Sequence, residues 1–219
     1  MARNQHDIAR ELLRTHGRPF WAEAGIRLRR NTPAPLFQLL VLCLLSSARI
    51  SSQIAMAGTR ALFDHGLTTP RKMADATWER RTRILNEAGY ARDDESTSRY
   101  LEDSAELLLD RWHGDLRELR EAADGDADTA VELLGDFKGI GPAGAQMFVR
   151  EVQGVWPELA PFVDGPSGRG AERLGLPTSA RSLRRLVDSD SELVDLVAAL
   201  VRSGMAHDED DIRDAAPSS

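Results

Sequence analysis

Apolar residues recur along nearly the whole chain at three- and four-residue intervals, and this helical periodicity limits the fold more than any other feature. No stretch shows the sustained alternation of apolar and polar residues that is typical of a half-buried strand. The segment Leu36–Leu45 is apolar on all sides, as expected for a helix buried at the centre of a domain. We therefore predict an all-α protein with this segment as its central helix.

The composition fits a helical core of aliphatic side chains. Hydrophobic residues make up 42% of the 219 residues and aromatic residues only 5%, which suits Leu, Ala, Val and Ile packed between helices. The only cysteine, Cys43, lies in the apolar segment and is predicted to be a core residue. Because one thiol cannot form an intramolecular disulfide or a multi-cysteine metal site, we expect no metal and no iron–sulfur cluster.

No apolar segment of the sequence approaches the length of a membrane span, and the N-terminal helix is polar, without the hydrophobic region of a signal peptide. We therefore expect a cytoplasmic protein that makes no contact with a membrane.

The charge distribution permits a nucleic-acid partner but does not demand one. The net charge is −7, and a negative protein repels a polyanion. The acids are concentrated, however, because residues 93–136 hold 15 acidic side chains against 4 arginines. The sequence outside this segment and the acidic C-terminal end is basic, and arginines supply nearly all of the positive charge, since Lys72 and Lys138 are the only lysines.

A glycine-rich turn, Phe137-Lys138-Gly139-Ile140-Gly141, lies between two short helical segments. The two glycines permit a tight turn and a close approach to the backbone, while Ile140 is placed to anchor the turn in the core. Pro142 suits the first position of the next helix, whose unpaired amides and dipole attract an anion. This pattern predicts a helix-hairpin-helix that holds a backbone phosphate. The alternative is a simple turn between two packed helices.

A second feature is Asp164, which ends the loop Phe162-Val163-Asp164 just before a helix that contains Arg169 and Arg173. A carboxylate at such a position can take part in chemistry beside a bound substrate. The alternative is that Asp164 only caps the helix that follows it.

In their order and spacing, the hairpin, the small-residue helix after it and the Val163-Asp164 loop resemble the core signature of the endonuclease III-like DNA glycosylase superfamily. The resemblance extends more weakly over residues 33–205. It implies a six-helix barrel lobe over residues 33–150, with the hairpin at 137–141, and a second helical lobe formed by residues 1–32 and 151–205. Residues 206–219, which are acidic and end in small polar residues, are predicted to be a disordered tail.

The resemblance also implies roles for particular residues. Duplex DNA with a lesion or mismatch would be the partner, and the target base would be flipped out of the stack. Asp164 would be the catalytic carboxylate beside the scissile glycosidic bond. Arg49 stands in the segment that matches a loop of the family that fills the gap left by the flipped base, and Arg169 is a second candidate for contact with DNA. The residues expected to bind phosphate are Lys138, Gly139, Ile140, Gly141, Ala143 and Gly144.

Several departures from the family pattern limit the chemistry. Ala143 stands where strand-cleaving members carry a lysine nucleophile, and the cysteines of the family's iron–sulfur cluster are absent. After Asp164 the usual Thr-His is replaced by Gly165–Gly168. We therefore predict a monomeric, monofunctional glycosylase without lyase activity and without an iron–sulfur cluster, with room for a monovalent cation at the hairpin.

Two other functions are compatible with the same residues. The departures after Asp164 also suit a catalytically silent relative that binds duplex DNA and releases no base. The acidic segment 93–136 also suits a helical interaction module that binds a basic protein. The target base is not encoded in any motif that we can place.

Overall fold

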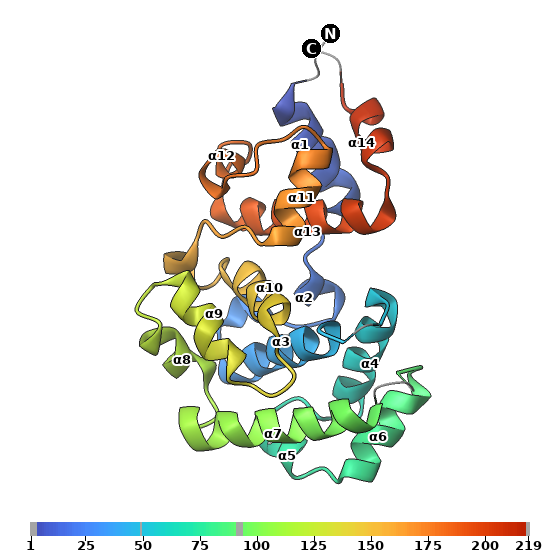
Figure 1. Ribbon diagram of the computed structural model, residues 1–219, viewed down its shortest axis with the longest axis vertical. Coiled ribbons are helices and arrows are strands. Elements are labelled where there is room, and N and C mark those ends of the chain that lie inside the picture. The colour runs from blue at the N-terminus through green and yellow to red at the C-terminus, as the bar shows by residue number, and fades with distance from the viewer. Residues whose placement is uncertain (1–3, 49, 91–93, 218–219) are drawn as a thin grey trace. The chain divides into compact units, whose positions relative to one another are not determined.

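The computed structural model describes residues 4–48, 50–90 and 94–217, and every regular element in these residues is a helix (Figure 1). This confirms the predicted all-α fold. The chain divides into two compact units. The internal unit is Ala24–Val149, and the terminal unit combines Met1–Glu23 with Arg150–Ser219. Among the described residues, no helix is long and apolar enough to cross a membrane.

The internal unit contains η1 and α3 to α9. Their bounds are Leu28–Arg30 (η1), Pro33–Ser46 (α3), Ser52–Asp64 (α4), Pro70–Ala74 (α5), Trp78–Glu87 (α6), Asp94–Trp112 (α7), Leu116–Ala122 (α8) and Ala127–Gly135 (α9). The helix α10, Pro142–Val152, begins in this unit, and the division of the chain falls inside its last turn.

The predicted central helix is α3, which is buried along almost its whole length. Its side chains from Leu39 to Leu45 are at most 3% exposed, Cys43 included. The helices α4, α7 and α8 and the 3-10 helix η1 contact it, and Figure 1 labels the three α-helices around it. A helix without a polar face can be stable only where neighbours cover every side of it, and α3 therefore organises the internal unit.

The terminal unit brings both ends of the chain together. Its elements are α1 (Gln5–His16), α2 (Phe20–Glu23), η2 (Pro157–Leu159), α11 (Gly165–Arg173), α12 (Ala180–Arg184), α13 (Asp190–Ala206) and α14 (Glu209–Ala215). The long helix α13 contacts α1, α11 and α12, and α1 also contacts α14. Their shared core includes Leu12, Leu174 and Leu196, each at most 1% exposed.

The unit boundaries differ from the predicted lobes at residues 24–32. The sequence predicts them in the second lobe, but they belong to the internal unit. The physical reason is burial, because Ala24, Ile26 and Leu28 are at most 5% exposed and η1 contacts α3.

The prediction of a disordered tail at 206–219 is wrong for the residues that the structure describes. Residues 209–215 form α14, and Ile212 (3% exposed) and Ala216 (3%) belong to the core of the terminal unit. Asp208 is held by Ser203 Oγ at 2.7 Å and by His16 Nε2 at 2.7 Å. Two apolar side chains four residues apart share one face of a helix, so a short acidic segment can still pack.

Candidate functional site

The hairpin at residues 137–141 connects α9 to α10 within the internal unit and requires glycine at one position. Gly139 has a φ of +85°, a conformation that favours glycine, and a Cβ there would lie 2.8 Å from Tyr100 Cδ2. Ile140 (5% exposed) is buried, as the sequence predicts for the anchor of the turn, and Phe137 (1%) is buried as well. Ser104 Oγ donates to the Lys138 carbonyl at 3.0 Å and so ties the turn to α7.

The turn delivers the chain directly into the first turn of α10. The Ala145 amide donates to the Gly141 carbonyl at 3.0 Å, which is the first bond of the helix ladder. The amides of Ala143 and Gly144 precede that bond, at positions for which an α-helix supplies no partner. The Lys138 side chain is exposed, and a Cβ added at Gly141 would meet nothing within 4 Å. The helix start can therefore attract an anion through its amides and dipole.

Two of the residues expected to bind phosphate have other contacts. The amide of Ile140 donates to the Phe137 carbonyl at 3.0 Å, so in this conformation it stabilises the turn instead of facing a ligand. Gly144 is buried, and a Cβ there would overlap Ser47 Oγ and lie 3.3 Å from the Cys43 carbonyl oxygen. The absence of a side chain at Gly144 thus lets α10 approach α3 closely.

Asp164, in the terminal unit, is buried and fully engaged. It is the N-cap of α11 and is 3% exposed. Its Oδ1 accepts from the Ser167 amide at 3.0 Å and from Ser167 Oγ at 2.5 Å. Its Oδ2 accepts from Arg150 Nη1 at 2.6 Å. The capping role that the sequence left as the alternative is therefore present, and Arg150 adds an ion pair to it.

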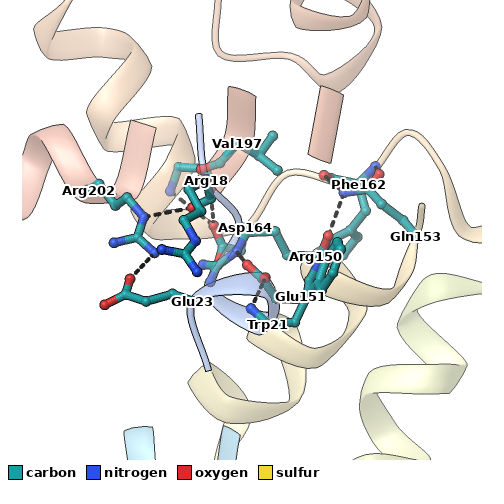
Figure 2. Close-up of polar contacts among 11 residues, drawn as sticks. Arg18, Trp21, Glu23, Arg150, Glu151, Gln153, Phe162, Asp164, Val197 and Arg202 are labelled. Atoms are coloured by element: carbon teal, nitrogen blue, oxygen red, sulfur yellow. Dashed lines mark hydrogen bonds and ion pairs between the residues drawn. The ribbon is translucent and has the colours of Figure 1, made fainter. Parts of the chain in front are cut away.

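Arg150 also binds a second carboxylate, so that two acids share one guanidinium (Figure 2). Arg150 Nε donates to Glu151 Oε1 at 3.2 Å, and the Trp21 amide donates to Glu151 Oε2 at 3.3 Å. Glu151 is 1% exposed. Burial raises the pKa of the Glu151 carboxyl above its ordinary value, and the nearby Arg150 charge and Trp21 amide offset this only in part.

A buried amide side chain holds the loop that carries Asp164. Gln153 Nε2 donates to the Phe162 carbonyl at 2.9 Å, and Gln153 Oε1 accepts from the Phe162 amide at 2.8 Å (Figure 2). The same Nε2 donates to the Arg150 carbonyl at 3.0 Å. The end of α10 and the loop before α11 are therefore joined by side-chain-to-backbone bonds, which fix Asp164 two residues beyond Phe162.

The sequence motifs do not point to Arg150, Glu151 or Gln153. A signal was nevertheless present, because the three polar residues follow Phe148 and Val149, both 0% exposed, at the end of a helix rich in small and apolar residues. Charged side chains at positions where the periodicity calls for burial are often paired or functional. Their actual partners, Asp164 and Trp21, could not be inferred from spacing alone.

Of the two arginines predicted to contact DNA, the structure describes only Arg169. Arg49 lies outside the described residues. Arg169 is exposed on α11, and its Nη1 lies 3.2 Å from the position of a Cβ built on Gly165, so the guanidinium covers the first turn after Asp164. Two aromatic residues of the internal unit, Tyr90 (1% exposed) and Trp112 (8%), belong to the core.

Comparison with known proteins shows the fold. No protein-family model and no curated protein matches the chain. Among solved structures, the chain is similar to that of a trapped endonuclease III–DNA covalent intermediate, an estranged-adenine complex. The identity is 19%, the TM-score is 0.50, and the match covers 78% of this chain and 74% of that chain. The all-helical fold described above is therefore similar to the fold of endonuclease III.

Proposed function

We propose that this protein is a DNA glycosylase that hydrolyses the bond between a damaged or mismatched base and its sugar, and that it does not cleave the strand. The observation that carries the proposal is the hairpin, in which Gly139 and Gly141 lead directly into the first turn of α10, whose amides precede the helix ladder. A turn of this kind in a fold similar to that of endonuclease III suits a site that fixes one DNA phosphate.

In the proposed reaction Asp164 acts on the sugar. The electrons of the C1′–N bond leave with the base, which takes up a proton, and the sugar develops positive charge. Water then adds to C1′ and loses a proton, giving the free base and an abasic sugar. A carboxylate beside the sugar stabilises the positive charge and can receive the proton of the water. Because Ala143 supplies no amine, water is the nucleophile and no Schiff base forms.

A second function is favoured by one observation, the engagement of Asp164. Both of its carboxylate oxygens are bonded, by Ser167 and Arg150, and the side chain is 3% exposed. A carboxylate so committed suits a structural cap in a protein that binds duplex DNA and leaves the base in place. The monomeric state, the cytoplasmic location and a monovalent cation at the hairpin remain predictions.

The deciding experiment is base release from a panel of duplexes that carry uracil, a thymine mismatch, oxidised bases or alkylated bases, with abasic sites revealed by hot alkali. We expect release from at least one duplex by the wild type and its loss in Asp164→Asn. The matched control is Asp126→Asn, which makes the same change at the N-cap of α9. Both variants are assayed below their measured unfolding temperatures.

The outcomes separate the functions. Release that Asp164→Asn leaves unchanged would contradict the proposed role of Asp164. Duplex binding without release from any member of the panel would establish the silent DNA-binding function. No binding even at low salt would favour the third alternative, a protein-interaction module.

A further inference from the structure

The cluster of Arg150, Glu151 and Asp164 contains one cation and two acids that are removed from water. All three residues are at most 3% exposed. Arg150 directs Nη1 to Asp164 Oδ2 at 2.6 Å and Nε to Glu151 Oε1 at 3.2 Å (Figure 2). The Phe20 ring, whose centroid is 5.3 Å from the Arg150 guanidinium carbon, also contacts this charge. Burying an acid beyond the one needed to neutralise Arg150 is costly, so Glu151 requires an explanation.

The charge of Asp164 supplies an explanation for the burial of Glu151. A carboxylate stabilises a cationic sugar through its negative charge, and a guanidinium 2.6 Å away opposes that effect. An Arg150–Asp164 pair alone would be neutral. When Glu151 on the same guanidinium is ionised, the three groups together carry one net negative charge. Glu151 thereby offsets the cation that Asp164 needs for its orientation.

We propose that Arg150 and Glu151 are positioning residues for Asp164: Arg150 fixes the carboxylate, and ionised Glu151 restores the net negative charge that acts on the sugar. This inference rests on the proposed glycosylase function. Neither residue needs to touch the substrate, because both act through Asp164.

The charged surroundings of Glu151 come from four elements. Arg150 belongs to α10, Asp164 precedes α11, and Arg202 of α13 also acts on the Glu151 charge. Arg202 is itself paired with Glu23 of α2 at 2.5 Å and donates to the Arg18 carbonyl at 3.0 Å (Figure 2). Arg202 is therefore already partly neutralised, which leaves Arg150 as the main partner of Glu151.

The proposal gives base release a particular pH dependence. Burial raises the pKa of Glu151. As the pH falls through this raised pKa, Glu151 takes up a proton and the cluster loses its net negative charge. The rate of base release should therefore be highest above the pKa of Glu151 and should decline at a pH at which an exposed glutamate would still be ionised.

The test compares two substitutions with opposite expectations. Glu151→Gln keeps the size of the side chain and removes its charge, whereas Glu151→Asp shortens it and keeps the charge. We expect Glu151→Gln to lower the single-turnover rate of base release by at least about tenfold at a pH above the pKa of Glu151. The variant should also lose the acid limb, which is the decline in rate as the pH falls through that pKa. Glu151→Asp should retain the acid limb and more of the rate, and the affinity for duplex should be unchanged in both. A purely structural role predicts the reverse order.

Two controls complete the design. Glu172→Gln makes the same change at an exposed residue of α11 and should leave the rate and the pH profile unchanged. Thermal unfolding establishes that each variant is folded at the assay temperature.

The results that would overturn the inference differ from those that would overturn the proposed function. An active wild type with a Glu151→Gln variant of equal rate and equal pH profile rejects the role of Glu151 alone. A wild type that releases no base from any duplex rejects the proposed function, and the inference with it.

Discussion

At the scale of single residues, the structure places an ionisable acid where ionisation costs the folded state free energy. Glu151 is 1% exposed, and its pKa is raised by burial, with the Arg150 charge and the Trp21 amide as partial compensation. In the unfolded chain the same carboxyl is hydrated and has its ordinary pKa. The folded protein therefore holds the Glu151 proton to a higher pH than the unfolded chain does.

This difference predicts a pH-dependent contribution to stability. The contribution of Glu151 is fully present below its unfolded pKa and is lost as the pH rises through its folded pKa. Compared with Glu151→Gln, the wild type should lose free energy of unfolding across that window, by about 1.4 kcal/mol for each unit of pKa difference. Urea denaturation of both proteins at a series of pH values measures this difference in the free energy of unfolding. Parallel curves for the two proteins across the whole range would contradict the prediction.

At the scale of elements, the sequence predicts most reliably the helices whose residues share one environment. The central helix α3 follows from its sequence because Leu36–Leu45 has no polar face to place in water. The hairpin is likewise local, because its turn has a positive φ at residue 139, which glycine adopts without strain. For the tail the sequence is misleading, because acids dominate its composition while only Ile212 and Ala216 belong to the core.

The contacts within the cluster of Arg150, Glu151 and Asp164 could not be predicted from the sequence. Arg150 and Asp164 are 14 residues apart, and their contact depends on how α10 and the loop before α11 pack. Helical periodicity assigns charged residues to solvent by default. The preference of aspartate for the N-cap predicts Asp164 at the start of a helix, as found. Neither this preference nor the periodicity identifies Arg150 as its partner.

The hairpin offers an element-scale test that separates DNA binding from folding. Gly141 has space for a Cβ and does not need the left-handed conformation, so Gly141→Ala should change the free energy of unfolding by no more than about 1 kcal/mol. The added methyl group would nevertheless stand where a phosphate is proposed to approach the backbone. We expect the affinity for duplex DNA, measured by fluorescence anisotropy, to fall by at least about tenfold, which is about 1.4 kcal/mol.

Gly135→Ala is the matched control for this substitution. Gly135 is the last residue of α9, and a Cβ there also meets nothing within 4 Å. The variant should bind duplex as the wild type does. Equal affinities for all three proteins would remove the hairpin from the proposed interface.

At the scale of the whole molecule, the net charge of −7 works against attraction to DNA from a distance. The internal unit, which carries the hairpin, also contains the segment 93–136 with its 15 acids and 4 arginines. Some of this charge is paired locally, as in the ion pair between Arg111 and Asp136 at 2.5 Å. The proposed binding of duplex DNA would therefore depend on a small number of close phosphate contacts more than on a broad positive surface.

Few phosphate contacts predict a shallow salt dependence to which Lys138 contributes measurably. The logarithm of the binding constant should fall linearly with the logarithm of the salt concentration, because each phosphate contact releases counterions. Lys138 is exposed on the hairpin, and Lys138→Gln should reduce the steepness of that line by about 1. The only other lysine, Lys72, is exposed on α5 in the same unit, and Lys72→Gln should leave the slope unchanged. If both substitutions change the slope equally, the lysines act through the overall charge of the protein, and a specific phosphate contact at the hairpin is rejected.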